Sequence, residues 1–65
     1  MLAFGEHLRE LRLSKELTQE KLAYKADVAI STIARIEAGG LNVSITLISK
    51  LSKALDVEKS ELMRF

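Results

Sequence analysis

The chain has 65 residues, with 10 Lys and Arg against 9 Asp and Glu, a single His, and no Cys, Pro or Trp. A chain of this length forms at most one small domain and is too short for a conventional enzyme with a deep cleft. The lack of Cys excludes a disulfide framework, and a lone His does not make a zinc site, so we expect no metal and no cofactor. The net charge of +1 by itself gives no support to a nucleic-acid partner.

Hydrophobic residues make up 48% of the chain, which is enough to form a core. The longest apolar run covers only residues 1–4, so the sequence predicts no membrane span. It also shows no basic region followed by a long apolar stretch, so we expect no signal peptide and a cytoplasmic protein. A core of this size contributes about 3 to 5 kcal/mol, so further stabilisation from a dimer would be unsurprising.

Apolar residues at helical spacing predict two helices in the first half of the chain. Their inner faces are formed by Phe4, Leu8 and Leu11, and then by Leu22, Ala23 and Ala26. The first helix is expected to end near residues 14–15. Thr18 offers an N-cap oxygen to a second helix of about eight residues. Asp27 tolerates left-handed backbone and therefore suits a tight turn after that helix.

Three further helices are predicted in the second half. The third begins at Ala29 or Ile30 and ends at Ala38, before a glycine pair at 39–40 that suits a C-terminal cap. Ser44 is a good N-cap for the fourth, Asp56 stands where that helix must stop, and a last short helix is expected over 58–64. The apolar stripes of the third and fourth helices are formed by Ile33 and Ile36, and by Ile45, Leu47, Ile48, Leu51, Ala54 and Leu55. The sequence therefore predicts a compact all-α domain of five helices over residues 1–65.

Residues 18–38 have the anatomy of a helix-turn-helix, because two short helices are joined there by a turn of three or four residues. Small Ala23 lets the second helix of the pair pack closely, and Val28 supplies an apolar plug after the turn. The outward face of that second helix carries Ile30, Ser31, Thr32 and Arg35. Short side chains with one Arg suit a helix that lies in the major groove of DNA.

At this point the sequence resembles the phage repressor and Cro type of helix-turn-helix domain found in bacterial regulators. The similarity covers about residues 4–63. It is carried by four segments in order, at 8–12, 17–23, 31–39 and 51–57. The resemblance implies a sequence-specific DNA-binding transcriptional regulator, a repressor or autoregulator, which binds double-stranded DNA at a palindromic operator as a homodimer.

The resemblance also implies roles for individual residues. Gln19 matches a position that contacts a DNA phosphate. Ile30, Ser31 and Arg35 match positions that face base edges or nearby phosphates, and Thr32 is adjacent to them and is expected to contact the backbone. Asn42 lies where the following loop approaches a phosphate. Arg12 and Glu37 match a structural pair that ties the first helix to the end of the third.

Two departures from the family pattern bear on these roles. Ala29 stands where Ser often caps the recognition helix, and Ile30 stands where a polar or basic residue is more usual. An exposed Ile in the major groove can contact a thymine methyl group. The Asn-x-Ser arrangement at 42–44 gives a weaker similarity to the controller proteins of restriction–modification systems.

The C-terminal segment 55–65 is more apolar than a short terminal helix needs in order to cover its own core. We expect it to form a homodimer interface through Leu55, Val57, Leu62, Met63 and Phe65. No small-molecule ligand is expected, because the chain leaves no room for a sensor domain.

An alternative reading is an antitoxin-like module that uses the same fold to bind a protein partner. Exposed Ile30 and Leu41, together with a weakly basic face, favour it. The predicted contact residues also have ordinary readings as solvated helix residues. Tyr24 is expected to pack at the edge of the second helix, and His7 to lie on the surface of the first. No acid pair, nucleophile–base set or metal cluster can be placed at a plausible spacing, so an enzyme is not expected.

Overall fold

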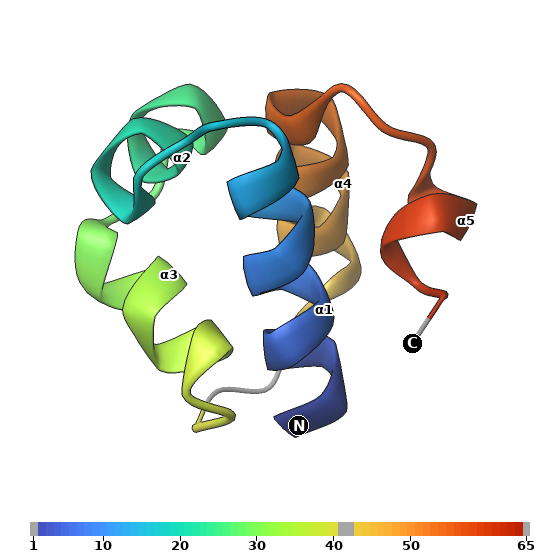
Figure 1. Ribbon diagram of the computed structural model, residues 1–65, viewed down its shortest axis with the longest axis horizontal. Helices are drawn as coiled ribbons and strands as arrows, with labels where there is room; N and C mark the ends of the chain where they lie inside the picture. Colours follow the sequence, from blue (N-terminus) through green and yellow to red (C-terminus); the bar gives the residue numbers. More distant parts are fainter. Residues whose placement is uncertain (1, 41–42, 65) are drawn as a thin grey trace.

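The computed structural model describes residues 2–40 and 43–64, which form five helices and, within those ranges, no strand (Figure 1). The helices are α1 (Leu2–Ser14), α2 (Gln19–Ala26), α3 (Ile30–Glu37), α4 (Ile45–Leu55) and α5 (Lys59–Leu62). The predicted all-α, five-helix architecture is confirmed. The last helix is shorter than the predicted 58–64, because the chain leaves helical geometry at Met63. None of these helices combines the length and the apolar character needed to cross a membrane.

Side-chain caps start two of the helices at the predicted residues. The Thr18 hydroxyl accepts a hydrogen bond from the backbone N–H of Lys21 at 3.0 Å, and the Ser44 hydroxyl accepts one from Leu47 at 3.1 Å. Ala29 has the same extended backbone at the start of α3 but makes no such bond. Helix α3 therefore begins with its first backbone N–H donors uncapped by a side chain.

Left-handed residues end the helices where the sequence predicts turns. Asp27 and Asp56 have φ of 58° and 57° after α2 and α4. Gly39 has φ of 82° after α3, and its N–H donates to the carbonyl of Ile36 at 3.0 Å. Glu16, with φ of 58°, is a left-handed position that the sequence did not predict.

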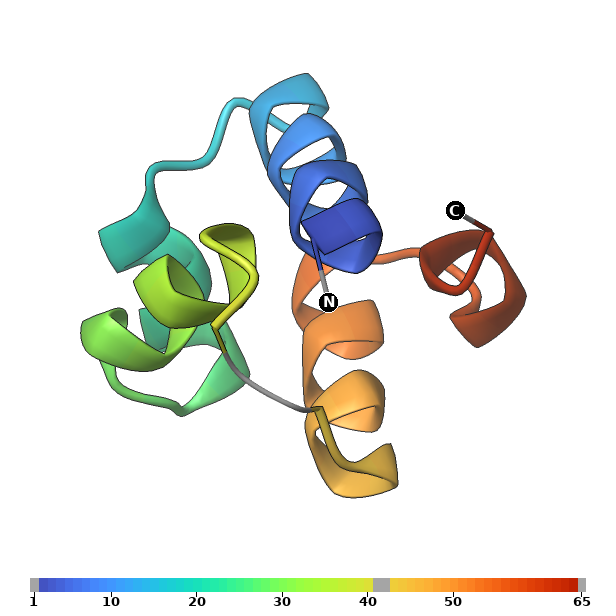
Figure 2. The same ribbon diagram turned by 90° about the horizontal axis from the view of Figure 1, so that it is seen from below.

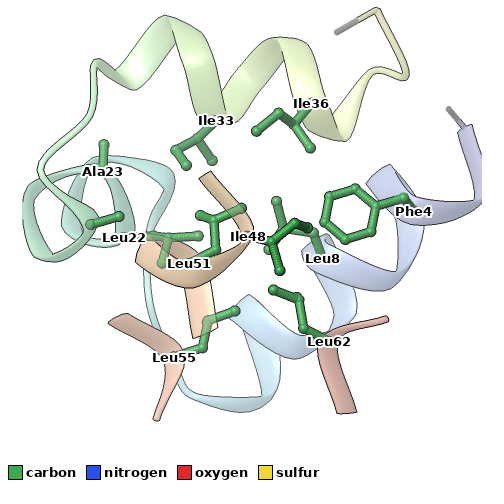
Figure 3. Close-up of a cluster of buried hydrophobic side chains, with 11 residues drawn as sticks. Phe4, Leu8, Leu22, Ala23, Ile33, Ile36, Ile48, Leu51, Leu55 and Leu62 are labelled. Atoms are coloured by element: carbon green, nitrogen blue, oxygen red, sulfur yellow. The ribbon is translucent and has the colours of Figure 1, made fainter. Parts of the chain in front are cut away.

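All five helices contribute to the core, and α2 packs against α3 and α4 (Figures 2 and 3). Its members are the buried apolar residues Phe4, Leu8, Leu22, Ala23, Ala26, Ile33, Ile36, Ile48, Leu51, Leu55 and Leu62. Leu55 and Leu62 are therefore core residues, and the expectation that they offer surface to a second copy is corrected. A helix as short as α5 needs Leu62 to hold it against the rest of the domain.

Two apolar side chains are more exposed than predicted. Ile45 is 84% exposed, because the first turn of α4 lies beyond the buried cluster, which the helix enters only at Ile48. Tyr24 is 85% exposed on the outer side of α2 and does not pack at its edge.

Helix α1 approaches both α3 and α5 closely. At Gly5 an added Cβ would lie 2.3 Å from the carbonyl oxygen of Ile36 and 2.9 Å from that of Glu37, so only glycine permits this crossing. Where α1 approaches α5, Nε2 of His7 lies 2.8 Å from the carbonyl oxygen of Glu61. His7 is thus half-buried and holds α5 in place, whereas the sequence predicted an ordinary surface residue.

Substituting Ala29→Ser should stabilise the domain by about 1 kcal/mol, because it supplies the missing cap at a backbone already in the capping conformation. Ala29 is exposed, so the hydroxyl meets no steric obstacle. Urea denaturation followed by circular dichroism measures the change. Thr18→Ala, which removes an existing cap, is the matched control and should lower stability by a similar amount. An unchanged midpoint for Ala29→Ser would contradict the capping argument.

Candidate nucleic-acid interface

Helices α2 and α3 form the predicted helix-turn-helix. Each has eight residues, and residues 27–29 connect them. Ala23 is buried at the contact, and its carbonyl accepts a hydrogen bond from the N–H of Val28 at 3.0 Å. Val28 is half-buried and packs on the core, as the plug was predicted to do. The turn is therefore fixed by packing as well as by the backbone of Asp27.

Helix α3 has one buried face and one free face. Ile33 and Ile36 point into the core with 0% and 1% exposure (Figure 3). On the other side Ser31 and Arg35 are exposed, Thr32 is half-buried and Ile30 is 47% exposed. The structure places Ile30, Ser31 and Arg35 on the outward face, as the sequence predicted, whereas Thr32 lies half-buried at the edge of that face. The small hydroxyl groups of Ser31 and Thr32 add little to the width of the helix, which suits entry into a groove.

The Arg12–Glu37 pair is present and is nearly buried, with side-chain exposures of 9% and 6%. Nε of Arg12 lies 2.6 Å from one carboxylate oxygen of Glu37, and Nη2 lies 3.1 Å from the other. Nη1 of Arg12 also donates to the carbonyl of Leu17 at 2.8 Å. The fork of Arg12 therefore ties the end of α1 to the end of α3 and to the loop before α2.

Gln19 joins this pair, which the sequence did not predict. Its Nε2 donates to Oε1 of Glu37 at 3.1 Å, so the buried carboxylate receives three side-chain hydrogen bonds from two helices. Gln19 is the first residue of α2 and Glu37 the last of α3. Periodicity places each on its own helix but does not show that these two ends meet.

The remaining predicted site residues are placed as follows. Asn42 and Phe65 lie outside the described residues. In the C-terminal segment Met63 is 48% exposed and Val57 is half-buried against the core. Met63 is therefore the predicted dimer residue with the most free surface among those that the structure describes.

Charge on the free face of α3 is sparse, because Arg35 is the only Lys or Arg in that helix. The N-termini of α2 and α3 add partial positive charge that a count of side chains omits. Among residues 2–40 and 43–64 no group of three or more His, Asp or Glu side chains could hold a metal ion. The interface therefore offers a few placed donors and no broad basic field.

Comparison with known proteins agrees with this geometry. A protein-family model described as helix-turn-helix matches residues 8–62. The chain belongs to this helix-turn-helix family, in its phage repressor and Cro type. The family is one of DNA-binding transcriptional regulators and is not an enzyme family.

Two relatives and one solved structure are similar to this chain over nearly its whole length. The chain is 46% identical over 65 residues to "Control protein C.BamHI" of Bacillus amyloliquefaciens, covering 98% of this chain and 80% of the relative. It is 41% identical over 64 residues to the HTH-type transcriptional repressor RghR of Bacillus subtilis (strain 168), covering 97% of this chain and 47% of that one. Among solved structures, the restriction-modification controller protein C.AhdI from Aeromonas hydrophila superposes with a TM-score of 0.93 at 45% identity, covering 95% and 94% of the two chains.

Removing the charge of Arg12 should destabilise this helix-turn-helix domain strongly. Arg12→Met leaves the Glu37 carboxylate buried without its cation, at a cost of about 3 kcal/mol or more. Urea denaturation should show a large fall in the midpoint. The double variant Arg12→Met/Glu37→Leu removes both charges and should recover most of the loss. A single-variant cost below about 1 kcal/mol would show that the pair is effectively solvated.

Proposed function

We propose that the chain is a homodimeric operator-binding regulator that inserts α3 into the major groove of a palindromic site. The observation that carries this proposal is the free outer face of α3, which lies over the fully buried Ile33 and Ile36. A helix held so firmly on one side presents the other side to a groove in a fixed orientation. A monomer reads only a few base pairs, so specific binding by this class normally joins two half-sites one helical turn apart.

Each exposed group on this face has a role in the proposal. The guanidinium of Arg35 donates to a guanine or to a nearby phosphate, and the hydroxyls of Ser31 and Thr32 contact bases or backbone. Gln19, at the N-terminus of α2, contacts a phosphate where the first helix of the pair crosses the backbone. Asn42 approaches a phosphate from the following loop. Ile30 contacts a thymine methyl group.

The relatives suggest a biological setting. Two of the similar proteins are control proteins, C.BamHI and C.MunI, and a close structural neighbour is a restriction-modification controller protein. We propose the same role for this chain: control of restriction–modification genes through an operator near its own gene. Random-site selection with the purified protein should enrich a palindrome that also occurs upstream of that gene.

The competing function is a protein-interaction module that uses the same fold, favoured by the exposed side chain of Ile30. Selection that enriches no sequence, together with equal affinity for all duplexes, would favour this alternative over operator binding.

Arg35→Ala should weaken binding to the selected operator by about 1 to 3 kcal/mol, measured by fluorescence anisotropy. Arg35 is exposed, so folding should not change. Arg9→Ala is the matched control, because it removes the same charge from an exposed residue of α1, outside both the helix-turn-helix and the C-terminal segment 55–65. Equal affinities for Arg35→Ala and wild type would remove Arg35 from the reading site.

A thymine methyl contact by Ile30 can be tested on the DNA. Replacing thymines of the operator one at a time by deoxyuridine should reveal one position at which wild-type affinity falls about fourfold, the value of one buried methyl group. Ile30→Ala should bind both duplexes equally at that position. If no thymine shows this dependence on Ile30, the side chain is a passive exposed residue.

Dimer formation through the C-terminal segment should be visible by sedimentation at tens of micromolar protein. Met63→Glu places a charge on the exposed apolar residue of that segment and should shift the chain toward monomer. Leu13→Glu is the matched control, since Leu13 is 53% exposed on α1 and Met63 is 48% exposed. A wild-type monomer at this concentration, or equal effects of both variants, would contradict the proposed interface.

A further inference from the structure

We propose that Glu37 is a positioning residue for DNA binding, which orients the side-chain amide of Gln19 toward a phosphate before DNA arrives. The inference rests on the proposed operator binding and adds to it a function for a residue that the sequence assigned to a structural pair. Glu37 itself does not touch DNA. It acts through the one hydrogen bond from Nε2 of Gln19 to its Oε1, at 3.1 Å.

The carboxylate fixes which way the amide faces. Arg12 holds both oxygens of Glu37, with Nε on one and Nη2 on the other. An ionised carboxylate only accepts hydrogen bonds, so it binds the NH₂ group of Gln19 and turns the carbonyl oxygen of that amide away. The orientation of Gln19 is therefore set by the chemistry of its partner, which is set in turn by Arg12.

The amide keeps a second donor for the phosphate. Nε2 carries two hydrogens, and the bond to Glu37 uses one of them. Gln19 is only half-buried and opens α2, the helix that crosses the DNA backbone in helix-turn-helix docking. The second hydrogen is thus not used by Glu37 and can be donated to a phosphate.

The charge balance of the Arg12–Glu37 pair permits a phosphate to approach Gln19. An isolated carboxylate near the DNA backbone would repel the phosphate, but Arg12 cancels the charge of Glu37 within a pair that is less than a tenth exposed. Gln19 is neutral and extends between this pair and the solvent. Fixing a free glutamine side chain on binding would weaken association about three- to tenfold, a loss that the preformed bond avoids.

Nuclear magnetic resonance tests the first step on the wild-type protein. Gln19 and Asn42 are the only side-chain carboxamides in the chain, so the Gln19 NH₂ signals are readily assigned. A positioned amide should have an order parameter close to the rigid backbone value of about 0.85. A value below about 0.6 in the free protein would overturn the proposal, and this measurement needs no variant that might fail to fold.

The variant Glu37→Gln tests the second step, because charge and positioning predict opposite results. Removing a negative charge beside DNA should by itself strengthen binding. A glutamine at position 37 can present either its NH₂ or its oxygen to Gln19, so it no longer enforces one orientation of that amide, and the loss of positioning should weaken binding about three- to tenfold. Glu20→Gln is the matched control, since it removes the same charge from an exposed residue in the first turn of α2 and should bind as tightly as wild type or tighter. Binding of Glu37→Gln that matches this control would overturn the proposal.

A phosphate-specific readout separates positioning from a loss of fold. Operator phosphates are replaced singly by neutral methylphosphonate, and the phosphate whose replacement weakens wild type but not Gln19→Ala is the partner of Gln19. Folded Glu37→Gln should also be insensitive at that phosphate. Full sensitivity there, or no Gln19-dependent phosphate at all, would overturn the inference while leaving Arg35-dependent operator binding intact. A protein that binds no DNA would overturn the proposed function as well.

Discussion

A carboxylate that is 6% exposed carries a desolvation penalty of several kcal/mol, and in this domain Arg12 and Gln19 offset it at the point where α1, α2 and α3 meet. Apolar contacts alone would hold α3 against the core through Ile33 and Ile36, but they are not directional. The hydrogen-bonded carboxylate fixes the end of α3 relative to the start of α2. This buried charge therefore adds a directional constraint to the packing that sets the relative orientation of α2 and α3.

The close crossing at Gly5 supports the same arrangement from the other side. The backbone of α1 lies against the carbonyls of Ile36 and Glu37, so the end of α3 is held by a backbone contact and by the side chain of Arg12. Helix α5 is held more lightly, through Leu62 and the bond between His7 and Glu61. The end of α3 is thus held to α1 by both backbone and side-chain contacts, whereas α5 is held by the burial of Leu62 and by the His7 bond.

Much of the fold could be predicted because its signals are local. The caps at Thr18 and Ser44 and the turns at Asp27 and Asp56 depend on single residues and their own backbone. The outward face of α3 follows from helical periodicity once Ile33 and Ile36 are assigned to the core.

The errors and omissions concern the ends of helices, where periodicity does not say which neighbour is present. Ile45 shares the side of α4 that carries Ile48 but lies one turn too early to be covered. Leu62 was expected at an interface because the sequence indicated a C-terminal segment more apolar than its own core needs, but the core buries this side chain completely. The bond of Gln19 to Glu37 joins residues 18 positions apart, and nothing in either helix alone indicates it.

A nearly neutral chain can bind DNA if a few donors are correctly placed, and this is the central claim for the domain. Titrating isotope-labelled protein with the selected operator tests it most directly, because every backbone amide and the single Gln side chain are observed together. The shifts should be concentrated at Gln19 and along 30–35, with α5 responding only through the dimer and a scrambled duplex giving little change. Shifts centred on α5 or on the outer side of α2 around Tyr24, with residues 30–35 unaffected, would contradict it.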